Sequence, residues 1–295
     1  AFRHVLLRDA IDELLPFDER ARLHRRLGEL LESELADPSA ERLDLLARHF
    51  SAALPAEKNA ERAIGYALRA AEAAARRLAW DDVERHAASA LRWLEDRPPS
   101  PAREAARLDA LLLRLAGWSA TQRSGRDVEE SLERATALAN ATGDPARQAR
   151  LAALALLFAT LQGRYREARA AALALRAREE AELSETARAC EASIDAFEGR
   201  FGRPREAGTW LAREAAAAAG AGTGAGAGID PETLALSVTP IAAWALGDEA
   251  SALAWLRGAL ARSERDPYAH AFSLFMGCVL HDLRRDPEAL LALAA

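Results

Sequence analysis

The chain has 295 residues, of which 50% are hydrophobic, 28% charged and only 6% aromatic. That is enough apolar material for one large core or two medium ones. The formal net charge of -6 argues against a general nucleic-acid binder, because such proteins are usually basic. Lys58 is the only lysine, and the arginines are scattered. A GC-rich genome, which favours Arg and Ala codons, explains this pattern better than a phosphate-binding cluster does.

Ala, Leu, Arg and Glu dominate the chain, and these are the strongest helix formers. No segment alternates with a period of two residues, so we expect helix nearly throughout and no sheet beyond a trace near Phe2. There is no signal peptide and no apolar run of about 18 residues. We therefore expect a cytoplasmic protein that does not contact a membrane.

The first forty residues differ from the rest because they show no repeat. The chain begins at Ala1 without a methionine and stops inside a helical pattern, so we expect a fragment of a longer protein. We assign residues 1–40 to the end of a preceding winged-helix-like domain or linker. Residues 41–295 are assigned to helical repeats, with a Gly/Ala insert at 219–228 and a truncated last repeat.

Apolar residues recur at helical spacing along the repeats. The longest stripe keeps a 4-3-4-3-4 spacing over five turns, and it consists of Leu183, Ala187, Cys190, Ile194, Phe197 and Phe201. This stripe predicts one continuously buried face, and we expect Phe197 to lie buried between neighbouring hairpins.

Short breakers separate the helices at regular intervals. Gly125, Gly163, Gly202 and Gly247 follow one another by 38, 39 and 45 positions, and the longest interval contains the insert. A further turn follows at Arg284, and looser breaks lie near Trp80 and Pro101. A period in the high thirties with two amphipathic helices is typical of a helix-turn-helix solenoid. The predicted fold is all-α, a right-handed α-α superhelix of TPR-like hairpins.

Catalytic and ligand motifs are weak by comparison. The insert lacks the Lys that a phosphate-binding P-loop requires, so we interpret it as a flexible, exposed connector. No histidine has a second histidine at i+4, and Cys190 and Cys278 are 88 positions apart, which favours packed free thiols over a disulfide or metal site. The six tryptophans suit core packing, with a ligand groove as the alternative. We assign no catalytic, cofactor-binding or metal-ligating residue.

The N-terminal stretch has the most distinctive residue pattern in the chain. Its distinctive residues are Phe2-Arg3-His4, Arg8-Asp9, Leu14-Leu15-Pro16, Arg20, Leu23-His24 and Leu31-Glu32. It resembles the segment that follows the nucleotide-binding module in bacterial STAND-type signalling ATPases, the predicted ATPases linked to adenylate cyclase, LuxR-type regulator or Ser/Thr kinase modules. His49-Phe50 looks like a helix end of that family, and Ala63-x-x-Tyr66 resembles the helix that opens its TPR-like repeats. The repeats depart from the strict TPR consensus of about 34 residues.

The resemblance implies a function for the chain. Residues 41–295 would be the non-enzymatic sensor and interaction arm of a cytoplasmic signal-transduction ATPase, with ATP bound only by a module outside this chain. The expected partner is a protein, a peptide or a small-molecule effector, with no direct contact to nucleic acid or membrane. Two alternatives stay open: a free-standing TPR-like assembly scaffold, and an α-solenoid enzyme with an unrecognised site.

Overall fold

The structure is a computed structural model that describes residues 14–33, 39–53, 57–95, 97–121, 123–177, 181–202, 231–264 and 266–294. Within these ranges every regular element is a helix and there is no strand, which confirms the all-α prediction. The helices are α2 (Phe17–Ser33), α3 (Ala40–Ala52), α4 (Glu57–Arg76), α5 (Trp80–Glu95), α6 (Pro101–Ala120), α7 (Arg126–Thr142), α8 (Pro145–Leu161), α9 (Tyr165–Arg176), α10 (Ala181–Phe197), α12 (Pro231–Ala245), α13 (Glu249–Ser263), α14 (Pro267–Leu283) and α15 (Pro287–Ala294).

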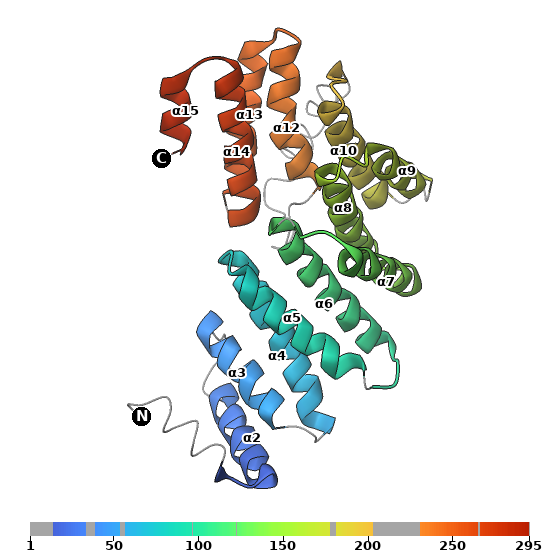
Figure 1. The fold of residues 1–295 in the computed structure, drawn as a ribbon, viewed down its shortest axis with the longest axis vertical. Coiled ribbons are helices and arrows are strands. Elements are labelled where there is room, and N and C mark those ends of the chain that lie inside the picture. Colours follow the sequence, from blue (N-terminus) through green and yellow to red (C-terminus); the bar gives the residue numbers. More distant parts are fainter. Residues whose placement is uncertain are drawn as a thin grey trace.

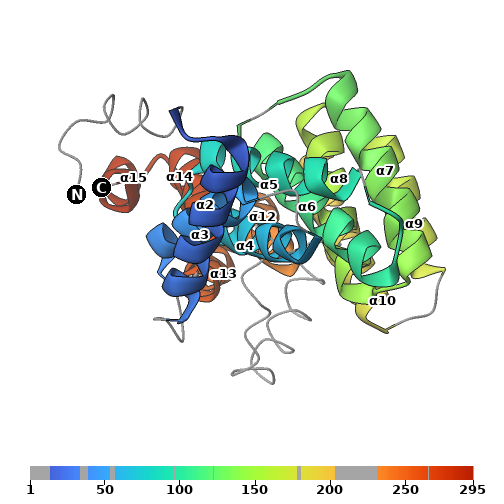
Figure 2. The same cartoon turned by 90° about the horizontal axis from the view of Figure 1, so that it is seen from below.

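The helices stack in chain order from one end of the molecule to the other (Figure 1). Consecutive helices pack as antiparallel neighbours, and α4, α6, α8, α10, α12 and α14 also pack each against the next of this set. We call these six helices the central row. Seen along the stack, α7 to α10 lie to one side of α2 to α4, so the hairpins turn about the stack as they ascend (Figure 2). The helical-repeat architecture is confirmed, and the handedness of the superhelix stays a prediction.

The turns that leave the central row share one backbone arrangement. A backbone N–H donates to a carbonyl five residues earlier, and the bonds are Ala79–Ala74 (3.0 Å), Arg123–Trp118 (2.8 Å), Arg164–Ala159 (2.6 Å), Arg200–Asp195 (2.7 Å), Asp248–Ala243 (2.9 Å) and Asp286–His281 (3.0 Å). This is the Schellman helix end, which needs a left-handed residue just before the donor. That residue is Gly163 (φ 69°) and Gly247 (φ 82°) at two of the predicted breaks, but at the third it is Gly199 (φ 76°) and not Gly202.

The buried stripe of α10 ends earlier than the sequence indicates. Ala187, Cys190 and Ile194 are buried, and Ile194 is 0% exposed, whereas Phe197 is 37% exposed. The prediction that Phe197 is buried is therefore wrong. Phe197 is the last residue of α10, where the chain turns away, so the neighbouring helices no longer cover it.

The N-terminal helix α2 packs directly on α3. A Cβ built on Gly28 would lie 3.0 Å from Cζ of Phe50, whose ring is fully buried. Phe50 in turn stacks on Tyr66 of α4, whose hydroxyl donates to Glu32 of α2 at 2.7 Å. The boundary at residue 40 stays a prediction. Phe2, His4 and the insert at 219–228 lie outside the described residues.

Candidate interaction surface

Five ion pairs join neighbouring repeats. In each pair the carboxylate comes first in the chain and the arginine follows 35 to 42 positions later. The pairs are Asp44–Arg85 (3.1 Å), Glu61–Arg103 (2.9 Å), Glu95–Arg134 (3.4 Å), Asp109–Arg147 (2.8 Å) and Glu249–Arg284 (2.7 Å). We call these the repeat-spaced ion pairs. Exposed pairs of this kind each contribute about 0–1 kcal/mol, so their main effect is to fix how one hairpin sits on the next.

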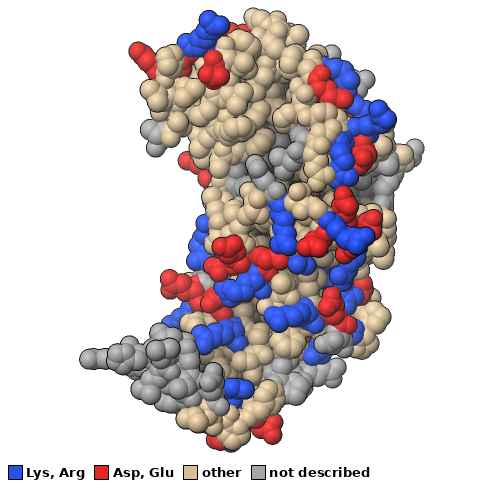
Figure 3. Space-filling model, viewed as in Figure 1, with Lys and Arg blue, Asp and Glu red and all other residues tan. Residues whose placement is uncertain are grey.

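Charge is unevenly distributed over the molecule. On the face shown in Figure 3, basic and acidic side chains are interleaved over the N-terminal part of the stack, whereas the region of α12 and α14 is mostly uncharged. Among the described residues of α14, two large apolar side chains are exposed, Phe275 at 61% and Leu283 at 41%. The charged half is therefore where the stack offers specific polar contacts.

Four charged residues gather where α4, α6 and α8 adjoin in the central row. Arg147 of α8 donates two parallel hydrogen bonds to Asp109 of α6, from Nε to Oδ1 and from Nη2 to Oδ2, both at 2.8 Å. The hydrogen bonds that Arg147 donates to Asp109 raise the pKa of Arg147 above its ordinary value. Glu72 of α4 and Arg150 of α8 complete the group. We call Glu72, Asp109, Arg147 and Arg150 the central-row site.

Asp144 adds a second carboxylate to Arg147. It begins α8 by accepting a hydrogen bond from the backbone N–H of Arg147 at 3.1 Å, and its other oxygen contacts the Arg147 guanidinium. The backbone hydrogen bond lowers the pKa of Asp144. Arg147 is therefore fully engaged by two carboxylates and has little capacity left for a ligand.

Arg150 is the arginine that this arrangement leaves out. It makes no hydrogen bond or ion pair within the described part of the chain, and its Nη2 is shielded from solvent without an acceptor. Burial lowers the pKa of its guanidinium, while the Asp109 and Glu72 carboxylates favour its charge and Arg147 opposes it. Arginine nonetheless stays protonated in proteins. Arg150 is thus a poorly hydrated cation with unused donors, in a residue that is itself partly exposed.

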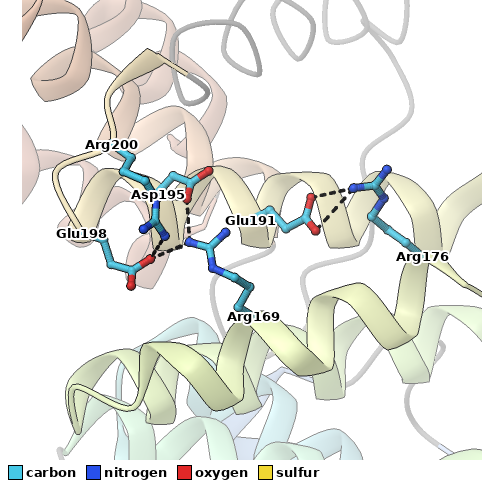
Figure 4. Close-up of polar contacts among 6 residues, drawn as sticks. All are labelled: Arg169, Arg176, Glu191, Asp195, Glu198 and Arg200. Atoms are coloured by element: carbon cyan, nitrogen blue, oxygen red, sulfur yellow. Dashed lines mark hydrogen bonds and ion pairs between the residues drawn. The ribbon is translucent and has the colours of Figure 1, made fainter.

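A second polar cluster joins α9 to α10 (Figure 4). Asp195 has a fully buried side chain and accepts from Arg169 at 2.6 Å and from Arg200 at 2.9 Å. Although burial opposes the charge, hydrogen bonds to Asp195 and Glu198 raise the pKa of Arg169. One turn before Asp195, Glu191 pairs with Arg176 at 3.0 Å. Buried carboxylates need such partners, so this cluster fastens the hairpin.

An open hollow of about 570 Å³ lies beside this cluster. It is lined by Arg169, Arg200, Phe201 and Gly202. Both guanidinium groups already bind the carboxylates of Asp195 and Glu198. The hollow therefore has no uncompensated charge among these residues, and we assign no ligand to it.

His24, His49 and His86 each contact a residue of another helix. Nδ1 of His24 and Nδ1 of His49 are 2.8 Å apart, which joins α2 to α3. The imidazole of His86 is buried, and its Nε2 lies 2.9 Å from Asp44. Sequence spacing along one helix misses these pairs because their members lie on different helices.

The cysteines and tryptophans behave as packed side chains where they are described. Cys190 is buried and Cys278 partly so, and both are free thiols; burial raises the pKa of Cys190 to about 12. Trp118 is 3% exposed and lies between the guanidinium groups of Arg114 (4.3 Å to the ring centroid) and Arg123 (4.6 Å). These contacts agree with a packing role for Trp118.

Within the described residues, no three His, Cys, Asp or Glu side chains are placed to hold a metal ion together. Among the described helices, none combines the length and the apolar composition needed to cross a membrane.

The sequence signal for the central-row site is periodicity of charge. Glu72, Asp109 and Arg147 are separated by 37 and 38 positions, which is the repeat period itself. Residues one period apart occupy equivalent places on successive central-row helices and so come together. The arginines look scattered along the chain because residues one repeat apart, and not neighbours in sequence, come together in the fold.

Comparison with known proteins adds no family assignment. No protein-family model matches the chain, and no curated protein shows significant similarity to it.

Proposed function

We propose that the chain is the non-catalytic protein-interaction and sensor region of a cytoplasmic signal-transduction ATPase, and that it regulates an ATP-binding module outside residues 1–295. The observation that supports it most is the central row, in which six alternate helices from separate repeats pack one against the next along the stack. Stacked repeats of this kind offer an extended surface. Such a surface suits recognition of a polypeptide, since affinity accumulates over many contacts along its length. The resemblance of the N-terminal stretch to STAND-type ATPases supplies the regulatory part of the proposal.

The physical requirement for regulation is differential binding. A ligand shifts the balance between a resting and an active state only by the difference in its affinity for the two states. The proposed arm would hold the ATPase in its resting state until a protein, peptide or small effector binds the repeats.

The test uses the complete gene product that contains residues 1–295. We expect it to bind and hydrolyse ATP, and we expect the hydrolysis rate to change when a ligand of the repeats is added. Nucleotide binding is measured by calorimetry and hydrolysis by phosphate release. A complete product that binds no nucleotide would refute the regulatory role and leave the assembly scaffold as the better explanation.

A further inference from the structure

The outer face of α2 carries a row of exposed leucines. α2 lies at one end of the stack (Figure 1), and among its described residues only Gly28 is buried. Leu23, Leu27 and Leu30 are 44%, 42% and 55% exposed. We propose that this face docks a short amphipathic helix of a partner protein, with a carboxylate of that helix beside Arg26. The inference rests on the proposed interaction function and gives it a second surface with a stated partner chemistry.

Helical spacing places the three leucines side by side, and we call Leu23, Leu27 and Leu30 the α2 row. Their separations of four and three positions are those of the seam along which two α-helices pack. At 3.6 residues per turn, the α2 row lies about 100° to 160° around the helix from Gly28. Gly28 faces the ring of Phe50 on α3. The α2 row therefore points away from α3, on a side where a further helix can pack.

The inner side of α2 is fixed by contacts that leave the α2 row uncovered. Nδ1 of His24 lies 2.8 Å from Nδ1 of His49 on α3, and Glu32 accepts a hydrogen bond from Tyr66 of α4 at 2.7 Å. Arg62 of α4 also lies 3.7 Å from Glu32. Because these contacts hold the helix in place, the α2 row is presented in a set direction, and a partner helix does not have to order it on binding.

Arg26 gives the α2 row a charged border. It lies three positions after Leu23 and four before Leu30, so its side chain adjoins both. Arg26 is exposed and forms no ion pair within the described part of the chain, whereas the nearby Arg22 pairs with Glu19 at 3.2 Å. A carboxylate that borders the apolar stripe of a partner helix would meet this unpaired guanidinium.

The charges of α2 disfavour two other occupants. Two copies of the chain packed antiparallel about Leu27 would place their Arg26 side chains on the same edge of the contact, where like charges repel. An anionic bilayer attracts helices with an excess of Lys and Arg. The α2 helix has four arginines and four carboxylates, so its net formal charge is zero. A protein helix with an acidic border fits both observations.

The test measures the binding of two synthetic helical peptides to the complete chain by fluorescence anisotropy. Both peptides carry leucine at heptad positions a and d, and they differ only at the bordering positions e and g, which are Glu in one and Lys in the other. We expect the Glu peptide to bind about twofold to fivefold more tightly, the effect of one exposed ion pair. Arg26→Gln should remove most of this preference and leave a similar, weaker affinity for both peptides.

Leu30→Gln tests the α2 row itself. Leu30 is the most exposed of the three leucines, so the variant should keep the circular-dichroism spectrum and the melting temperature of the original chain. It should bind both peptides about fivefold to tenfold more weakly, because it loses an apolar contact. Leu291→Gln is the matched control. Leu291 belongs to α15 at the other end of the stack and is 68% exposed, and its loss should leave binding unchanged.

Four results would overturn the docking site on α2. The first is failure of both peptides to bind, and the second is equal binding of the two or binding insensitive to Leu30→Gln. The third is a dimer of the chain in sedimentation velocity that Leu30→Gln dissociates, which would make the occupant a second copy. The fourth is binding to vesicles of equal parts phosphatidylcholine and phosphatidylserine that Leu30→Gln abolishes. None of these results bears on ATP hydrolysis, so the α2 site can fail while the regulatory proposal stands.

Discussion

Truncation of Ile194 to alanine should destabilise the fold much more than truncation of Phe197. Ile194 is 0% exposed, and its buried neighbours are mostly alanines: Leu156, Ala159, Ala168, Ala172, Cys190 and Ala269. Replacing a buried Ile by Ala costs about 2–5 kcal/mol, from lost transfer energy and the cavity left behind. Alanine has no side-chain rotamer that could move into the space, so we expect the upper part of this range. Phe197 is 37% exposed, solvent fills the space it leaves, and about 1–2 kcal/mol is expected.

Hydrogen exchange followed by mass spectrometry measures both the size and the spread of this effect. In a stack of repeats each hairpin contacts mainly its neighbours, so Ile194→Ala should speed exchange in α8, α9 and α10 and have much less effect on α2 to α4. Phe197→Ala is the matched control on the same helix. A larger effect from Phe197→Ala would refute the assignment of the buried face. Uniform loss of protection along the chain would refute the repeat-by-repeat account of stability.

Three further predictions concern single side chains. Gly65→Ala should stabilise α4 by roughly 0.5–1 kcal/mol, because a Cβ at that position meets nothing within 4 Å. Gly28→Ala should instead be destabilising, because its Cβ would press on the buried ring of Phe50, and such overpacking costs about 1–3 kcal/mol. Urea titration measures the free energy of unfolding of both variants. Iodoacetamide should label Cys278 well before Cys190, whose pKa of about 12 leaves almost no thiolate, and equal labelling of the two would contradict the assigned burial. Burial lowers the pKa of His86, so the unfolded chain binds a proton that the folded chain does not; stability should fall as the pH drops below 6.5, and His86→Gln should reduce that loss.

The helices and most of their ends could be predicted from sequence because they depend on local patterns. Helix-forming composition and 3.6-residue periodicity are properties of short windows. At Gly163 and Gly247 the left-handed turn is marked by the residue that adopts positive φ most easily, whereas Leu78 and Arg285 adopt it at two other helix ends. The buried end of a stripe is different, since it depends on where the neighbouring helix stops. The spacing places Phe197 on the same face as Ile194. Only the packing of the hairpins shows that neighbouring helices cover Ile194 and leave Phe197 partly exposed.

The central-row site could not be predicted from neighbours along the chain, because its members come from three helices. The repeat-spaced ion pairs follow one rule: a carboxylate on one repeat meets an arginine on the next. Arg147 obeys this rule with Asp109. Arg150 lies one helical turn further along the same face of α8. The Asp109 carboxylate already accepts two hydrogen bonds from Arg147. A rule that fixes how hairpins sit on one another therefore also determines which arginine is left with unused donors. The Nη2 donor of Arg150 is consequently buried without an acceptor among the described residues.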